Sequence, residues 1–234
     1  SESYFGTTVA DPYRALENAK DPDVARWFRQ QADYTRATLD KIPQRQRIYD
    51  EIVKYGDAAS ARVTTLQVSN DYIYYEKRLA NENVPKIYVR RGYAGAERLL
   101  VDPDALGMTD GKHNAIDYYA PSQDNKYLAY GVSIGGSENS VLHVVDVATG
   151  KETGDVIDRA QYGSPSWLPD NRLVYSRLQQ LAADSPVTDR YQNQRVYVHK
   201  LGTTADQDVA LLGAKIGTIT NIAPTELVFA FNPV

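Results

Sequence analysis

Residues Tyr118 to Trp167 read YYAPSQDNKYLAYGVSIGGSENSVLHVVDVATGKETGDVIDRAQYGSPSW. Ser122 to Asn125 predicts a polar turn, because Asp and Asn side chains bond their own backbone and tolerate the left-handed region. Tyr127 to Tyr130 is aromatic and apolar, as expected of a buried strand. Ala148 to Lys151 predicts a hairpin turn, with Gly150 at a positive φ. The stretch is therefore a succession of short strands and tight turns.

This strand pattern recurs along the chain at a spacing of roughly 45 to 55 residues, which is typical of propeller blades. A second apolar run follows each of the first three repeats and predicts a further strand. The repeated unit is an apolar pair followed by an aromatic residue, at Ile73-Tyr74-Tyr75, Leu128-Ala129-Tyr130, Leu173-Val174-Tyr175 and Leu227-Val228-Phe229. The runs that follow are Ile87-Tyr88-Val89, Leu142-His143-Val144-Val145 and Val196-Tyr197-Val198.

The repeat predicts a mainly β fold, an incomplete β-propeller of about three blades and part of a fourth, preceded by a short α-helical amino-terminal segment. One blade is a small sheet that cannot bury both faces alone, so neighbouring blades must stack on it. Glu226 to Phe231 is expected to be the last strand, in the fourth blade. A β-sandwich of short strands is the alternative, but a sandwich needs no such internal period.

The first part of the chain differs in kind from the repeats. Asp21-Pro22 predicts the start of a helix, since Asp caps a helix and Pro fits its first position. Pro43 is expected to end this helix, and a second, shorter helix follows. From Arg62 onward the pattern switches to period two. We therefore expect a helical amino-terminal segment over residues 1–58 and propeller blades over residues 59–234.

The composition excludes several classes of protein. The formal net charge of −4 argues against nucleic acid or an anionic membrane as the main partner. The chain has no cysteine, so it has neither a disulfide framework nor thiol chemistry. No stretch is apolar for long enough to span a bilayer. The sequence leaves a cytoplasmic and a periplasmic location equally open.

One short motif resembles that of a catalytic serine. Gly131-Val132-Ser133-Ile134-Gly135 fits the G-x-S-x-G nucleophile elbow. The elbow requires a strand, a sharp turn and then a helix, whereas Gly136 to Ser140 is followed by a β-branched strand. We therefore expect Ser133 to lie in the hairpin loop of a blade, and we assign no catalytic residue in this chain.

The sequence also predicts no metal or cofactor site. His113, His143 and His199 lack metal-ligand spacing, and two of them lie in corresponding strands of two blades. The run that begins at Asp102 starts like a calcium loop, but Leu106 occupies a ligand position and no Glu closes the loop. Asp102-Pro103 is expected to turn the chain out of a blade.

Several segments together resemble the prolyl oligopeptidase family of serine peptidases. The resemblance covers nearly the whole chain, in the order expected of the family, although Ala15 stands where the family usually has Trp. The segments are Val9 to Glu17 (VADPYRALE), Leu100 to Asp104 (LVDPD), Asp124 to Gly131 (DNKYLAYG), Gly136 to Glu138 (GSE), Trp167 to Asp170 (WLPD) and Val196 to Gly202 (VYVHKLG).

The resemblance implies an architecture and a function. A full-length relative would be a serine endopeptidase that cleaves short peptides after proline, with the propeller controlling substrate access. Its Ser, Asp and His would lie in an α/β-hydrolase domain of the same parent chain, beyond Val234. The helical segment, with Val24, Trp27 and Phe28, would pack on that domain. The expected partners are thus short proline-containing peptides and the hydrolase domain, without nucleic acid, membrane or cofactor.

The resemblance also implies two substrate-binding residues. Glu138 matches an acidic residue that pairs with a substrate-binding arginine across the domain interface, and Tyr162 matches an aromatic residue that lines the substrate pocket. Without the resemblance, Glu138 is a charge at a hairpin tip and Tyr162 contributes to blade packing. The alternative function is a non-catalytic propeller module that binds a protein or peptide on its face.

Overall fold

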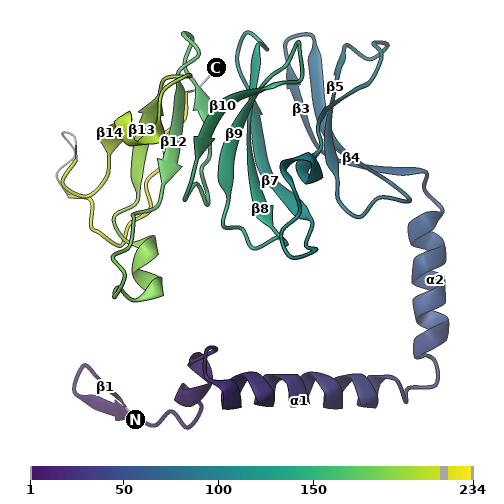
Figure 1. Cartoon of the computed structure of the whole chain (residues 1–234), viewed down its shortest axis with the longest axis vertical. Coiled ribbons are helices and arrows are strands. Elements are labelled where there is room, and N and C mark those ends of the chain that lie inside the picture. Colours follow the sequence, from purple (N-terminus) through teal and green to yellow (C-terminus); the bar gives the residue numbers. More distant parts are fainter. Residues whose placement is uncertain (1, 217–220, 233–234) are drawn as a thin grey trace. The chain divides into compact units, whose positions relative to one another are not determined.

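The computed structural model describes residues 2–216 and 221–232 of the chain. The chain divides into two compact units, Ser1–Ala59 and Ser60–Val234. The first is mainly helical, and the second is built of antiparallel sheets (Figure 1). No helix in the described part of the chain is long and apolar enough to cross a membrane.

The first unit begins with a small hairpin and continues into two helices. Strands β1 (Glu2–Tyr4) and β2 (Thr7–Val9) pair antiparallel. A short 3-10 helix, η1 (Arg14–Glu17), leads to α1 (Pro22–Leu39) and α2 (Arg45–Asp57). Asp21 caps α1 as predicted, because its carboxylate accepts a hydrogen bond from the backbone N–H of Asp23 at 2.8 Å. The helix ends at Leu39, earlier than the expected end at Pro43.

In the described residues of the second unit, the chain forms three four-stranded antiparallel sheets, in which consecutive strands are neighbours. These sheets are the predicted propeller blades, and they stand side by side in Figure 1. Blade 1 consists of β3 (Ala61–Ser69), β4 (Tyr72–Leu79), β5 (Lys86–Arg91) and β6 (Arg98–Val101). Blade 2 consists of β7 (Asn114–Pro121), β8 (Tyr127–Ile134), β9 (Val141–Asp146) and β10 (Glu152–Ile157). Blade 3 consists of β11 (Ser166–Trp167), β12 (Leu173–Arg177), β13 (Arg195–His199) and β14 (Val209–Leu212). Short 3-10 helices lie in some of the connections: η2 (Pro103–Leu106), η3 (Val187–Tyr191) and η4 (Ala205–Gln207).

The hydrophobic core lies between the blades, because strand side chains alternate between the two faces of a sheet. In β8, Leu128 and Tyr130 pack toward blade 1, whereas Ala129 packs toward blade 3. A third cluster covers the other face of blade 3, where Val174 and Val196 contact Val228 of the carboxy-terminal segment. The facing sides of neighbouring blades thus bury each other, as the repeat predicted, and the carboxy-terminal segment covers part of the other face of blade 3.

Hydrogen bonds also join neighbouring blades along their first strands. The Gln67 amide donates to the carbonyl of Tyr119 at 2.9 Å, and the Trp167 indole N–H donates to the carbonyl of Ala120 at 2.9 Å. The Asn232 amide donates to the carbonyl of Trp167 at 3.0 Å. These bonds satisfy backbone carbonyls of β7 and β11, the first strands of blades 2 and 3, and the first two bonds link the three blades in series.

The structure confirms most strand predictions and corrects two. The repeated runs are the second and third strands of each blade, and the turns at Asn125 and Gly150 adopt the expected positive φ. Ser133 lies in β8 and not in the hairpin loop, because the turn begins only at Gly135. Residues 226–231 form no strand, so the expected last strand from Glu226 to Phe231 is not found.

Candidate functional site

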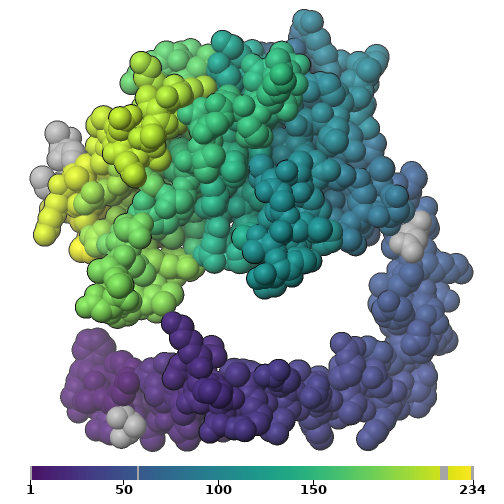
Figure 2. All heavy atoms as spheres, viewed as in Figure 1, coloured from purple at the N-terminus to yellow at the C-terminus, as the bar shows by residue number. Residues whose placement is uncertain are grey.

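Three connections emerge at one end of the sheets. In an antiparallel meander, the loop after the second strand and the link after the fourth strand emerge at the same end. The three connections are the β8–β9 loop (residues 135–140), the β10–β11 link (158–165) and the β12–β13 loop (178–194), which contains η3. The last of these projects from the propeller unit in Figure 2. These connections carry both predicted site residues.

Arg190 of η3 joins the three connections. Its Nη2 lies 2.7 Å from Asn139 Oδ1 in the β8–β9 loop and 3.2 Å from Gln161 Oε1 in the β10–β11 link. The hydroxyl of Tyr191 lies 2.9 Å from the same nitrogen. The guanidinium also stacks over the ring of Tyr191, 4.9 Å from its centroid. The neighbours of Glu138 and Tyr162 are therefore brought together by one cation.

The backbone of Glu138 is held in the loop while its side chain stays exposed. Glu138 has a φ of 60°, a region that costs a non-glycine residue roughly 1–2 kcal/mol. Its N–H donates to Ser133 Oγ at 3.1 Å, and its carbonyl accepts from Ser140 Oγ at 3.3 Å. No ion pair joins Glu138 to another residue within the described ranges. The carboxylate is thus available to a partner outside these residues.

Ser133 acts as an anchor for this loop and lacks the geometry of a nucleophile. Its hydroxyl donates to Asp117 Oδ1 at 3.0 Å, and the hydroxyl of Ser140 donates to Asp117 Oδ2 at 2.6 Å. One carboxylate therefore holds both ends of the loop. Ser133 is only 1% exposed, and β8 continues into a hairpin rather than a helix, so the nucleophile elbow is absent here.

Tyr162 lies in a tightly held turn of the β10–β11 link. Its φ is 60°, and 44% of the residue is exposed. On either side the backbone is fixed: Gln161 is buried, and a Cβ on Gly163 would come within 2.5 Å of the Tyr118 hydroxyl oxygen. Only glycine fits at position 163, so the turn holds the Tyr162 ring at the surface.

A cavity of about 310 Å³ lies among the three connections. Its walls combine two arginines and four side-chain amides with two leucines, a mixture that suits a ligand with both polar and apolar parts. Glu138 and Tyr162 do not line it, but their neighbours do. The lining residues are Asn139, Arg159, Gln161, Leu178, Gln179, Gln180, Leu181 and Arg190.

His143 is held by packing, and His199 is held between two carboxylates. His143 stacks on Tyr130 with ring centroids 5.5 Å apart, and burial lowers its pKa. His199 Nε2 lies 3.0 Å from Asp155 Oδ1, and its Nδ1 lies 2.9 Å from Asp208 Oδ1. Within the described residues, no group of three or more His, Asp or Glu side chains is arranged to hold a metal ion.

Arg190 and Asp117 were not found from the sequence. Arg190 lies in a polar loop without periodicity, where nothing distinguishes it from a solvated surface charge. Asp117 lies in β7 and Ser133 lies in the neighbouring strand β8, and the register between these strands shifts between Ile116 and Tyr118. A bulge of this kind changes which side chains share a face, so the contact with the serine could not be read from residue spacing.

The three stacked sheets, with the connections at their end, define the class of the molecule as a β-propeller portion. A family model described as the prolyl oligopeptidase N-terminal β-propeller domain matches residues 1–217. The chain belongs to this family, as its sequence motifs indicated. The described residues contain its propeller portion and no α/β-hydrolase domain.

Individual relatives agree with this assignment. The prolyl endopeptidase of Elizabethkingia meningoseptica is 25% identical over 213 residues, which are 91% of this chain and 30% of that protein. A solved structure from a study of two prolyl endopeptidases matches with a TM-score of 0.79 and 30% identity, over 89% of this chain and 30% of the other. Prolyl oligopeptidase B from Galerina marginata shares the fold, with a TM-score of 0.68 and 20% identity over 88% of this chain and 31% of that protein. The chain thus spans about 30% of the length of these relatives.

Proposed function

We propose that this chain is the substrate-filtering portion of a serine endopeptidase that cleaves short peptides after proline. The observation that carries the proposal is the family match over residues 1–217. In this function, a hydrolase domain of the longer protein supplies a serine that attacks the scissile carbonyl, a histidine that moves the proton and backbone donors that hold the oxyanion. The propeller admits small, flexible peptides and excludes folded proteins.

In this proposal, Glu138 pairs with an arginine of the hydrolase domain, and Tyr162 lines the substrate pocket from the propeller side. Three features of the site support these roles. The Glu138 carboxylate is exposed and forms no ion pair within the described residues. The backbone of each residue is held at a strained, positive φ. The cavity between their neighbours has a mixed polar and apolar lining.

The first test measures cleavage by the full-length protein. A blocked dipeptide p-nitroanilide with proline before the scissile bond should be hydrolysed much faster than the matching alanine compound. The 234-residue chain alone should release no nitroaniline from either compound. If the chain alone hydrolyses a compound and this turnover disappears in a Ser133→Ala variant, the proposal that catalysis belongs to the hydrolase domain would be overturned.

The second test concerns Glu138. Glu138→Gln in the full-length protein should raise the KM for the proline substrate or slow domain closure, because an ion pair across the interface is lost. Asp184→Asn is the matched control, since Asp184 is an exposed carboxylate in the neighbouring β12–β13 loop. Wild-type kcat and KM in the Glu138 variant would reduce this residue to a surface charge.

A non-catalytic propeller module is the second candidate, and the cavity lined by Asn139 and Arg190 favours it. That cavity is formed by this chain alone and therefore needs no hydrolase domain to bind a peptide. If the full-length protein binds proline peptides but hydrolyses none, the binding module is correct and the peptidase is not.

A further inference from the structure

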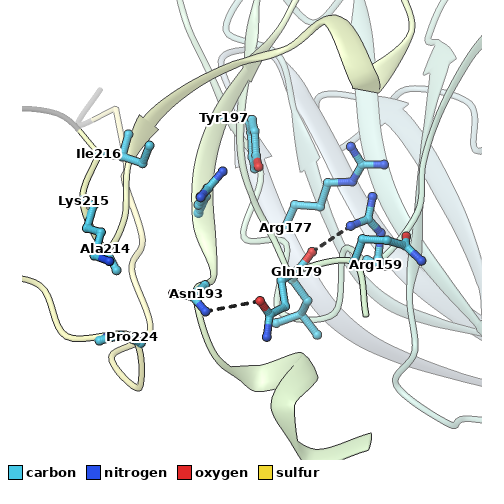
Figure 3. A pocket seen from close by; sticks show the side chains of 12 residues that line it. Arg159, Arg177, Gln179, Asn193, Tyr197, Ala214, Lys215, Ile216 and Pro224 are labelled. Carbon is cyan, nitrogen blue, oxygen red and sulfur yellow. Dashed lines mark hydrogen bonds between the residues drawn. The ribbon is translucent and has the colours of Figure 1, made fainter. Parts of the chain in front are cut away.

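A second, larger cavity lies beside the first, at the end of blade 3. Its volume is about 590 Å³. It shares Arg159, Leu178, Gln179 and Gln180 with the smaller cavity, so the two adjoin. In Figure 3, Arg159, Arg177 and Gln179 lie on one side of it, and the segment Ala214–Ile216 with Pro224 lies on the other. The remaining lining residues are Asn193, Arg195 and Tyr197.

The lining of this cavity is strongly cationic. Four of its residues are Arg159, Arg177, Arg195 and Lys215, and none of the lining residues is acidic. The whole chain carries a formal net charge of −4. The cavity is therefore positively charged although the chain as a whole is negatively charged. This local positive charge attracts anions.

Two of the four cations are already neutralised in part. Asp158 accepts hydrogen bonds from Arg159 Nε at 3.0 Å and from Arg177 Nε at 3.1 Å. Arg177 is only 8% exposed, and Asp206 Oδ1 lies 3.5 Å from its Nη1. These contacts compensate the desolvation of the buried Arg177 guanidinium. Arg177 therefore forms part of the cavity wall, but its charge is already paired.

Arg195 and Lys215 form no ion pair with any residue in the described ranges. Arg195 lies over Gly213, where a Cβ would come within 2.9 Å of Arg195 Cγ. Glycine at position 213 therefore permits the close approach of the arginine stem. Lys215 follows on the other side of the cavity at a φ of 62°. The two unpaired cations supply the binding charge.

The rest of the lining favours a peptide over an inorganic anion. Gln179, Gln180 and Asn193 carry amides, and each amide has both donors and acceptors. Peptide backbone uses both kinds of group, whereas phosphate or sulfate leaves the acceptors without a partner. Asn193 Nδ2 already donates to Gln179 Oε1 at 3.2 Å, a bond drawn in Figure 3. Tyr197, Leu178 and Ile216 add apolar surface for a side chain.

We propose that this cavity is a binding site for the carboxylate of a peptide, with Arg195 and Lys215 as its charged contacts. Arginine matches a carboxylate with two parallel N–H···O bonds, and lysine adds a point charge. The choice of a peptide as the ligand rests on the proposed function, whereas the need for an anion follows from the lining charge alone. The carboxylate is either the peptide terminus or an acidic side chain.

The experiment measures binding to the full-length protein by calorimetry, with three proline-free tetrapeptides that the proposed peptidase does not consume. The first has a free carboxy terminus and neutral side chains, the second an amidated terminus and one Asp, and the third an amidated terminus and no charge. The third should bind about tenfold more weakly than whichever of the first two fits the site, because charge-assisted hydrogen bonds are lost. The preference should shrink at high salt.

Variants assign the preference to the cavity. Lys215→Gln and Arg195→Gln should each weaken binding of the preferred peptide about tenfold and leave the uncharged peptide unaffected. Arg91→Gln is the control, because Arg91 is an exposed arginine of blade 1 that only pairs with Asp71 at 3.2 Å. Lys215 is exposed, so its variant keeps the test valid if the Arg195 variant fails to fold.

Three outcomes would overturn the proposal. The first is equal binding of the three peptides or no binding of any. The second is displacement of the preferred peptide by inorganic phosphate at equal concentration, which indicates a general anion site. The third is an unchanged preference in both variants. Hydrolysis of an uncharged proline substrate is measured separately, so failure of the peptidase function and failure of this site give different results.

Discussion

At the residue scale, Ser133 shows how a sequence motif and a structural role can differ. Its hydroxyl connects Asp117 to the backbone N–H of Glu138. Ser133→Ala should lower the free energy of unfolding by about 1–2 kcal/mol, because it leaves Asp117 and this N–H each short of one partner. Chemical denaturation of the chain measures the loss. Ser137→Ala is the control, since Ser137 is exposed in the same loop and should change stability little.

His199 gives the chain a predicted pH dependence. The residue is buried between Asp155 of blade 2 and Asp208 of blade 3. Burial disfavours the charged imidazolium, but the hydrogen bonds to Asp208 and Asp155 outweigh burial and raise the pKa of His199. For Asp155, burial is likewise outweighed, by hydrogen bonds from Thr153, His199 and Gly202, and the pKa of this carboxyl is lowered.

The direction of the effect follows from the two shifts. A raised histidine pKa stabilises the fold fully below the unfolded value of about 6.5, and this contribution is lost as pH rises through the folded pKa. The contribution of Asp155 is present above its unfolded pKa of about 3.9 and is lost as pH falls through the lowered value. The two contributions to stability are therefore both fully present between about pH 3.9 and pH 6.5, the two unfolded pKa values.

We expect the melting temperature of the chain to fall as pH rises above about 6.5, and His199→Gln should remove this slope. The variant should also be less stable by roughly 3–5 kcal/mol between about pH 3.9 and pH 6.5, since two buried carboxylates lose their charged partner there. His143→Gln is the matched control, because burial lowers the pKa of His143. The contribution of His143 to stability therefore changes with pH below about 6.5 and not above it. An unchanged slope in the His199 variant would contradict this role.

At the scale of elements, the blades share a polar contact as well as the apolar repeat. A tyrosine of the second strand donates to a carboxylate at or just before the fourth strand and stacks on an aromatic ring of the third. In blade 2, for example, the hydroxyl of Tyr130 lies 2.7 Å from Glu152 Oε1 while the ring stacks on His143. The corresponding donors and acceptors are Tyr75 and Glu97 in blade 1 and Tyr175 and Asp208 in blade 3.

This contact predicts the effect of a single hydroxyl. Tyr130→Phe should lower the free energy of unfolding by about 1–2 kcal/mol, because Glu152 loses its donor. Burial already raises the pKa of Glu152, and the Tyr130 hydroxyl opposes that shift, so the pKa should rise further in the variant. Denaturation and carboxyl titration by NMR measure the two effects. Tyr93→Phe is the control, because Tyr93 is 86% exposed and its variant should match the wild type.

The sequence predicted elements whose signals are local. The apolar runs marked the second and third strands, and Asp21 marked the start of α1, because periodicity and capping depend on residues close in sequence. It could not predict contacts that depend on distant loops, such as Arg190 with Asn139. Leu227-Val228-Phe229 was wrongly predicted as a strand, because an apolar run becomes a strand only when a partner completes its hydrogen bonds.

At the scale of the whole molecule, the third blade is incompletely covered. Val228 packs on Val174 and Val196, but Leu227, Phe229 and Phe231 of the same segment are 45%, 38% and 70% exposed. The outer strand β14 adds two exposed apolar residues, Val209 and Leu211. A propeller hides such faces by stacking a further blade on them. In the longer protein that we propose, a fourth blade takes this place.

The 234-residue chain alone should therefore self-associate through this face, because exposed apolar patches drive association. Light scattering after size exclusion should show a mass above the 26.1 kDa of one chain, rising with concentration. A Leu227→Ser, Phe231→Ser double variant should shift the chain toward the monomer. The matched control is Tyr34→Ser in α1, another exposed aromatic residue, which should leave the association unchanged because it lies in the other unit. A monodisperse monomer with a sharp cooperative melt would show instead that residues 221–232 cover blade 3 well enough on their own.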